Sequence, residues 1–397
     1  MENNLLKKLN NPMSPFYVFD SDELIKRVEL LNSKMPDNAV LCYAIKANPF
    51  LIPLLKDTGI LFEVCSPGEL SICEKYKVNP KQIVFSGVCK TLEDVQRAYK
   101  LCVKTITLES PLHCEYLIKT IENEEKPHTQ EVILRLTGGN QFGMSAEDIL
   151  LCLEKLSKIE SVKIRGIHYF TGTQKKLSKI LDEVNFINQY CKDLQNKTGV
   201  NFTDIEYGPG LSYNYFDGQA FSNNFSDFEQ FSAALKASAF NYVVELGRYI
   251  ASSCGTYITK IMDIKNDGDK RYCIIDGGIN HINYYGQIMG MKVPFVYQTD
   301  SNFECKQNTG GEKYTICGSL CTTADVVLRE LSLSVPKPGD FLVFNDIGAY
   351  SITEGIYLFL SHPLPAVYIK KGEDFSLARL PIESSEINFA SNINNYK

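Results

Sequence analysis

The sequence lacks the features that mark membrane-spanning and nucleic-acid-binding chains. None of its apolar runs approaches the roughly 18 residues that a membrane-spanning helix needs. No apolar stretch follows a positively charged N-terminal region, so we expect a cytoplasmic protein without a membrane partner. The net charge is −6 and no long basic run occurs, which argues against nucleic acid as a partner.

Residue spacing typical of metal sites and disulfide frameworks is also missing. The 13 cysteines are scattered singly through apolar segments, and no Cys-x-x-Cys pair occurs. This pattern is typical of reduced core cysteines. The 5 histidines show no ligand spacing, so we predict no metal site. Tryptophan, sequence repeats and low-complexity tracts are absent as well.

What the chain does contain is a regular alternation of short apolar runs and amphipathic segments. Eight runs predict strands, at 41–47, 61–66, 82–87, 105–110, 131–136, 164–170, 204–210 and 241–248. The segments between them have apolar residues at helical spacing. Eight strand-then-helix units within about 250 residues favour a (β/α)8 TIM barrel over an open sheet. Functional side chains of such barrels gather at the C-terminal ends of the strands.

Beyond residue 250 the sequence changes to runs of β-branched and aromatic residues separated by Gly, Pro, Asp and Asn. We therefore predict a barrel domain over residues 25–255 and an all-β domain over residues 256–397. The N-terminal segment 1–24 contains a predicted strand at 15–20 that precedes the barrel. We expect this segment to join the β domain.

Lys46 follows a short apolar run, at the predicted end of the first barrel strand. A buried ammonium without a partner is unstable, so a lysine at this place either points outward or takes part in amine chemistry. The surrounding sequence decides between these alternatives. Ten motifs occur in order: YAIKAN (43–48), FEVCSPGEL (62–70), VFSGVCK (84–90), QFGM (141–144), GIHYFTGTQ (166–174), YGPGLS (207–212), ELGR (245–248), DGGIN (276–280), CGSLCTTAD (317–325) and GAYS (348–351).

Together these motifs resemble the fold-type III pyridoxal-phosphate decarboxylases, the family of diaminopimelate and ornithine decarboxylases. The resemblance implies pyridoxal 5'-phosphate as the cofactor, bound at the C-terminal face of the barrel and attached to Lys46. It also implies which residues bind the cofactor's phosphate: Thr173, Gly208, Gly210, Gly247, Arg248 and Tyr350. By itself, Gly-Pro-Gly at 208–210 is more often only a turn.

Glu245 matches the family's glutamate that keeps the ring nitrogen of the cofactor protonated. Alanine racemases share the fold type but place an arginine there, so Glu245 favours decarboxylation over racemisation. Cys321 matches the family's cysteine that protonates the product carbon. Cys317 is its rival in the same segment. In the family this cysteine comes from the partner subunit, which implies a homodimer with shared active sites.

Several positions depart from the family pattern. Phe170 replaces the histidine that stacks on the cofactor ring, while His168 matches the first histidine of that motif and is either a site residue or a core histidine. By the same resemblance, we expect Thr322, Asp325 and Arg248 to contact the substrate. Thr322 stands where the family has a Glu or Asp that meets the substrate's distal ammonium, and a neutral hydroxyl would leave that ammonium unpaired. No arginine follows DGGIN closely to bind a distal carboxylate.

These departures argue against diaminopimelate as the substrate. The motifs DGGIN, CTTAD and GAYS are more similar to the branch that contains the glutamyl-acyl-carrier-protein decarboxylase of butirosin biosynthesis. The sequence therefore predicts decarboxylation of an L-amino-acid-like group, either a small molecule or one tethered to a carrier protein. Two alternatives stay open: an ordinary diaminopimelate, lysine or ornithine decarboxylase, and an inactive homologue that only binds.

Overall fold

The computed structural model describes residues 6–9, 12–216, 225–285, 290–307 and 311–390. The chain divides into two compact units. One consists of the described residues within Ile25–Tyr213 and Asn223–Ile250, and the other of those within Met1–Leu24, Asn214–Ser222 and Ala251–Lys397. No helix in the described part of the chain is both long and apolar enough to cross a membrane.

The first unit is a closed barrel of eight parallel strands, which confirms the predicted fold. Its strands are β2 (Ala39–Ala44), β3 (Leu61–Val64), β4 (Ile83–Phe85), β5 (Thr105–Leu108), β6 (Gln130–Leu136), β7 (Val162–Phe170), β8 (Asp204–Gly208) and β9 (Asn241–Leu246). Each strand pairs with the next along the chain, and β9 closes the ring on β2. Six of the eight strands end two or three residues before their predicted ends, and only β6 and β7 reach them, at residues 136 and 170.

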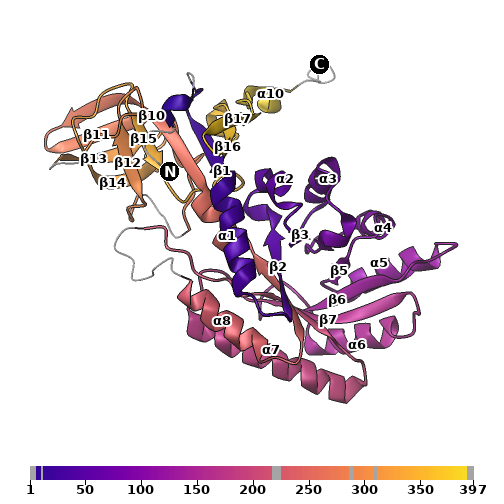
Figure 1. Ribbon diagram of the computed structural model, residues 1–397. Helices are drawn as coiled ribbons and strands as arrows, with labels where there is room; N and C mark the ends of the chain where they lie inside the picture. Colours follow the sequence, from indigo (N-terminus) through magenta and orange to yellow (C-terminus); the bar gives the residue numbers. More distant parts are fainter. Residues whose placement is uncertain (1–5, 10–11, 217–224, 286–289, 308–310, 391–397) are drawn as a thin grey trace. The chain divides into compact units, whose positions relative to one another are not determined.

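Helices follow the strands and lie around the outside of the barrel (Figure 1). They are α1 (Ser21–Lys34), α2 (Ile52–Leu55), α3 (Pro67–Lys75), α4 (Leu92–Lys100), α5 (Pro111–Glu122), α6 (Ala146–Leu156), α7 (Leu177–Thr198) and α8 (Ser226–Lys236). The four-residue helix α9 (Arg248–Ala251) follows β9. Side chains just before several of these helices cap the free N–H groups of the first turn. Thr91, for example, forms a reciprocal capping box with Asp94 at the start of α4.

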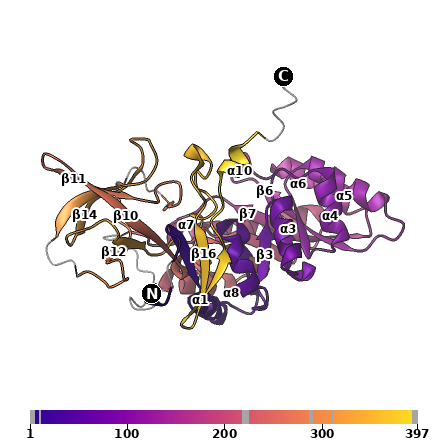
Figure 2. The same ribbon diagram turned by 90° about the horizontal axis from the view of Figure 1, so that it is seen from above.

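The second unit is a mostly β domain built on a nine-stranded sheet, in the order β14-β13-β11-β10-β1-β16-β17, with β15 pairing β10 and β12 pairing β15 (Figure 2). Its strands are β1 (Phe16–Asp20), β10 (Gly255–Asp267), β11 (Lys270–Ile275), β12 (Val296–Thr299), β13 (Glu312–Cys317), β14 (Val326–Leu333), β15 (Phe341–Phe344), β16 (Ala366–Lys371) and β17 (Asp374–Arg379). A short helix, α10 (Ser385–Asn388), follows.

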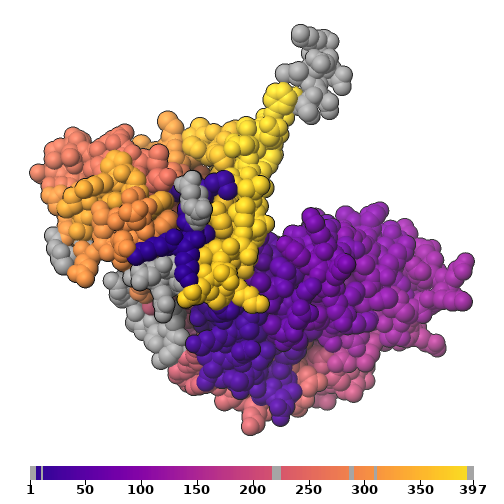
Figure 3. Space-filling model, turned by 45° about the horizontal axis from the view of Figure 1, so that its top comes forward, coloured from indigo at the N-terminus to yellow at the C-terminus, as the bar shows by residue number. Residues whose placement is uncertain are grey.

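The N-terminal strand β1 belongs to this sheet, where it runs antiparallel to β10 and parallel to β16. In the space-filling view, indigo N-terminal atoms accordingly lie beside yellow C-terminal ones (Figure 3). The core of the sheet is apolar and includes Phe16, Val18 and Ile258. All 13 cysteines of the chain are free, and seven of them are buried, as expected for core residues.

Candidate functional site

Lys46 lies in a 3-10 turn (Ile45–Ala47) that directly follows β2. Its Nζ contacts both carboxylate oxygens of Glu63, at 3.0 and 2.9 Å, and lies 3.6 Å from the thiol sulfur of Cys65. The side chain is 43% exposed. The predicted strand over 41–47 therefore ends before Lys46, and the amine stands one turn beyond it, paired with an acid.

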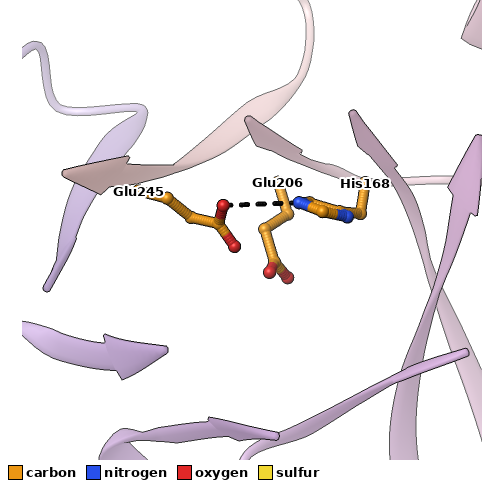
Figure 4. Close-up of side chains that lie close together, drawn as sticks. All are labelled: His168, Glu206 and Glu245. Carbon is orange, nitrogen blue, oxygen red and sulfur yellow. Dashed lines mark hydrogen bonds and ion pairs between the residues drawn. The ribbon is translucent and has the colours of Figure 1, made fainter. Parts of the chain in front are cut away.

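The interior of the barrel holds a buried cluster of three polar side chains from adjacent strands: His168 on β7, Glu206 on β8 and Glu245 on β9 (Figure 4). Nε2 of His168 lies 3.4 Å from Oε2 of Glu245. One nitrogen or oxygen from each residue lies within 4.8 Å of the others. Within the described residues, His168 Nδ1, Glu206 Oε1 and Glu245 Oε1 are buried and have no hydrogen-bond partner.

The two acids of this cluster have opposite electrostatic tendencies. Burial, followed by repulsion from Glu245, raises the pKa of Glu206 well above its ordinary value. Burial alone would also raise the pKa of Glu245, but the His168 imidazole and Glu206 together outweigh it and hold that pKa well below its ordinary value. At neutral pH, the expected state is an ionised Glu245 beside a protonated Glu206.

Phe170 and Gly208 pack against each other next to this cluster. A Cβ on Gly208 would lie 2.5 Å from the Phe170 ring and 3.2 Å from Oε2 of Glu245. The Arg135 guanidinium lies 6.0 Å from the centroid of the Phe170 ring. The phenyl ring that replaces the family's histidine therefore lies beside Glu245.

Two turns at the same rim pack backbone against backbone. Gly210 has a left-handed φ of +61°, and a Cβ there would lie only 2.1 Å from the carbonyl oxygen of Gly172 and 2.9 Å from Cα of Thr173. The N–H of Lys175 donates to the Gly210 carbonyl at 2.9 Å. Such turns can present several N–H groups to an anion. Gly247 directly follows the neighbouring strand β9, and the buried Arg248 begins α9.

The remaining predicted residues lie in the β unit. Cys321 and Thr322 are exposed on the loop between β13 and β14, whereas Cys317 is half-buried at the end of β13. Asp325 is 2% exposed, and its two carboxylate oxygens accept the N–H groups of Ile279 and Leu320 at 2.9 and 2.8 Å. In this structure it therefore fixes the loop, and its predicted contact with substrate stays a prediction.

Tyr284 and Tyr285 follow the DGGIN motif in the same unit and differ in burial. Tyr284 is buried, and its hydroxyl donates to the carbonyl of Asn345 at 2.6 Å, so it belongs to the core. Tyr285 is 48% exposed. Tyr350 is half-buried and adopts a left-handed φ of +68°.

The sequence analysis missed three polar residues that line the barrel: Glu63, Glu206 and Arg135. Arg135 forms a buried ion pair with Glu109. Each missed residue stands within a predicted strand, flanked by apolar side chains, and a charged residue at such a place is itself a signal of a polar interior. His, Glu and Glu are also metal-ligand types, so the prediction of no metal site stays a prediction.

A family model described as "Pyridoxal-dependent decarboxylase, pyridoxal binding domain" matches residues 21–252. Among curated proteins, the chain is 25% identical to the L-glutamyl-[BtrI acyl-carrier protein] decarboxylase of Niallia circulans, over 92% of this chain and 91% of that protein. It is 27% identical to the 2-[(L-alanin-3-ylcarbamoyl)methyl]-2-hydroxybutanedioate decarboxylase of Staphylococcus aureus, over 91% and 94%.

Solved structures share the fold. The diaminopimelate decarboxylase of M. jannaschii superposes with a TM-score of 0.82 at 22% identity, covering 97% of this chain and 93% of that one. A lysine decarboxylase of Selenomonas ruminantium superposes with a TM-score of 0.79 at 19% identity, covering 94% and 96%.

Proposed function

We propose a function from the premise that this chain belongs to the family of pyridoxal-dependent decarboxylases. It is a pyridoxal-phosphate-dependent amino-acid decarboxylase.

The residues at the barrel rim fit the cofactor. Lys46 offers an amine for attachment, and the turns at Gly208 and Gly210 leave room only for backbone. One observation carries the proposal: Glu245 is buried, and its Oε1 has no partner among the described residues, while its lowered pKa favours the ionised form. A buried charged acceptor left unpaired is costly unless a donor arrives with a ligand. The protonated ring nitrogen of the cofactor is such a donor.

When bound, the cofactor supplies an aldehyde for attachment and a ring that accepts electrons as carbon dioxide leaves. In our proposal the amine of Lys46 attaches the cofactor through its aldehyde carbon, and Glu245 keeps a proton on the ring nitrogen. Thr173, Gly208, Gly210, Gly247, Arg248 and Tyr350 bind the phosphate. The contact between His168 and Glu245 supports a site role for His168, and the place of Phe170 beside Glu245 supports packing against the ring.

Replacing Lys46 tests these roles. We expect Lys46→Ala to abolish carbon dioxide release and the visible absorption band of the lysine-bound cofactor, with the protein still folded by circular dichroism. The matched control is Lys158→Ala, an exposed lysine on the outside of the barrel whose side chain is 69% exposed. A wild-type protein that shows no such band after cofactor is added would instead be an inactive homologue.

Cys321 is proposed to protonate the product carbon in the active site of a partner subunit. Its exposure on the β13–β14 loop leaves the thiol accessible. We expect Cys321→Ala to lose activity and Cys317→Ala to retain it. Mixing the inactive Lys46→Ala and Cys321→Ala variants should restore about a quarter of wild-type activity, because half the dimers would be mixed and each would hold one intact site. No restoration would refute a shared site.

We further propose a substrate whose distal end is conjugated rather than charged. Thr322 is neutral where the family has an acid, and two relatives act, by their names, on an L-glutamyl group on a carrier protein and on an L-alanine joined through a carbamoyl group. The test measures carbon dioxide from L-glutamyl carrier protein and from free diaminopimelate, lysine and ornithine. Rapid turnover of any free amino acid would favour the ordinary decarboxylase alternative.

A further inference from the structure

Glu206 is a buried acid to which the proposed function assigns no role. It lies in the middle of β8, is 1% exposed and belongs to the cluster with His168 and Glu245 (Figure 4). Within the described part of the chain, Glu206 forms no ion pair, and both Glu206 and Glu245 have one buried oxygen without a hydrogen-bond partner. Two buried carboxyls so close together cannot both ionise without a large cost.

We propose that Glu206 stays protonated and donates its proton to Glu245, which makes it a positioning residue that keeps Glu245 ionised toward the cofactor's ring nitrogen. This inference rests on the proposed role of Glu245. A proton on Glu206 that is hydrogen-bonded to Glu245 would give the buried carboxyl of Glu206 a partner and keep Glu206 neutral. The burial of Glu206 and its proximity to an ionised neighbour both favour the neutral form.

The charged and titratable groups that face the two acids come from the surrounding elements: Cys42 on β2, Lys46 on the following turn, Glu63 on β3, Lys90 on the loop after β4, Arg135 on β6 and His168 on β7. Most are already neutral or paired. Burial raises the pKa of Cys42, Lys46 pairs with Glu63, and Arg135 pairs with Glu109. Lys90 donates to the carbonyl oxygens of Ser86 and Gly87, and His168 contacts Glu245, so none of these side chains forms an ion pair with Glu206.

A proton donated by Glu206 would matter for the reaction. Glu245 and the ring nitrogen compete for one proton, and a hydrogen bond to the Glu245 anion weakens Glu245 in that competition. The proton then stays on the ring, where it supports electron withdrawal. Without the donor, the proton would shift toward Glu245 and the ring would accept electrons less well.

Two variants at position 206 distinguish the effect of a hydrogen-bond donor from the effect of an ionisable group. Glu206→Leu removes the donor at similar volume, and Glu206→Gln keeps an N–H donor but cannot ionise. The infrared difference spectrum between wild-type and Glu206→Gln holoenzymes at neutral pH should contain the carbonyl band of a protonated carboxylic acid. With cofactor labelled with 15N in its ring, nitrogen chemical shifts should show a protonated ring in wild type and Glu206→Gln, and a reduced protonated fraction in Glu206→Leu.

Kinetics give a third readout. We expect Glu206→Leu to lower kcat about tenfold or more, with KM changed less than about twofold, since the effect acts on electron withdrawal rather than on substrate contacts. Absence of the carboxylic acid band would overturn the inference, as would an unchanged nitrogen shift in Glu206→Leu. A stoichiometric divalent metal that is lost in Glu206→Gln would also overturn it, because a cation would then replace the shared proton.

Glu245→Gln separates this inference from the proposed function. If that variant leaves the ring nitrogen protonated and the activity intact, the proposed role of Glu245 fails. If Glu245→Gln changes both while Glu206→Leu changes neither, only the inference about Glu206 fails. Should Glu206→Leu not fold, as judged by circular dichroism, the infrared band in the Glu206→Gln comparison decides alone.

Discussion

Gly210 offers a sharp test of the turn proposed to bind the cofactor's phosphate. We predict that Gly210→Ala weakens cofactor binding, because the structure leaves no space for a side chain. The added Cβ would lie 2.1 Å from the carbonyl oxygen of Gly172. Ordinary carbon–oxygen contacts are no shorter than about 3.3 Å, so the two turns must separate by roughly 1 Å.

The size of the effect follows from two contributions. Alanine in the left-handed region, at φ +61°, costs about 1 kcal/mol relative to glycine. Separating the turns also breaks the hydrogen bond from the Lys175 N–H to the Gly210 carbonyl, which contributes about 1 kcal/mol. Any steric overlap that remains with Gly172 adds to these two costs. If a total of about 2–3 kcal/mol is lost when the cofactor binds, affinity falls about 30- to 150-fold.

The assay is a titration of cofactor-free protein followed by absorbance. Gly199→Ala is the matched control, because Gly199 also has a left-handed φ, +72°, at the C-cap of α7, but no atom lies within 4 Å of its added Cβ. We expect this control to lose about 1 kcal/mol of folding stability and no cofactor affinity. If Gly210→Ala bound the cofactor as tightly as Gly199→Ala, the two turns would not form the phosphate site.

Two further predictions concern the stability of the barrel. Burial lowers the pKa of His113 to about 4, below the 6.5 of an exposed histidine. As the pH falls, the unfolded chain therefore takes up this proton before the folded protein does. The contribution of His113 to the free energy of unfolding should be fully present above pH 6.5 and should fall by up to about 3 kcal/mol toward pH 4. Denaturant titrations at several pH values should show this decrease in wild type and lack it in His113→Gln. Arg135→Met should destabilise the protein by about 3–5 kcal/mol, because Glu109 stays buried without its partner. The control is Lys158→Met, at an exposed ion pair, and equal stabilities of the two variants would refute this prediction.

The fold could be predicted because its pattern is local. The barrel strands are short, mainly apolar runs, and α3, α4, α5 and α6 each begin with a side-chain N-cap, such as Thr91 before α4. Strand ends were less predictable. The runs through Lys46 and Arg248 continue in apolar or helix-compatible residues, and only the closed barrel determines that hydrogen bonding stops at Ala44 and Leu246.

The candidate site likewise contains residues that the sequence could predict and residues that it could not. Lys46 and Glu245 stand in recognisable motifs, whereas Glu206 acquires its significance only from its neighbours. The register of β7 against β8 places His168 opposite Glu206, and the adjoining strand β9 brings Glu245 into the same interior. These residues are up to 77 positions apart, and no sequence spacing encodes their proximity. A single proton shared by two acids is a property of the closed barrel, so a strand sequence can indicate that an acid is buried but not which neighbour holds its proton.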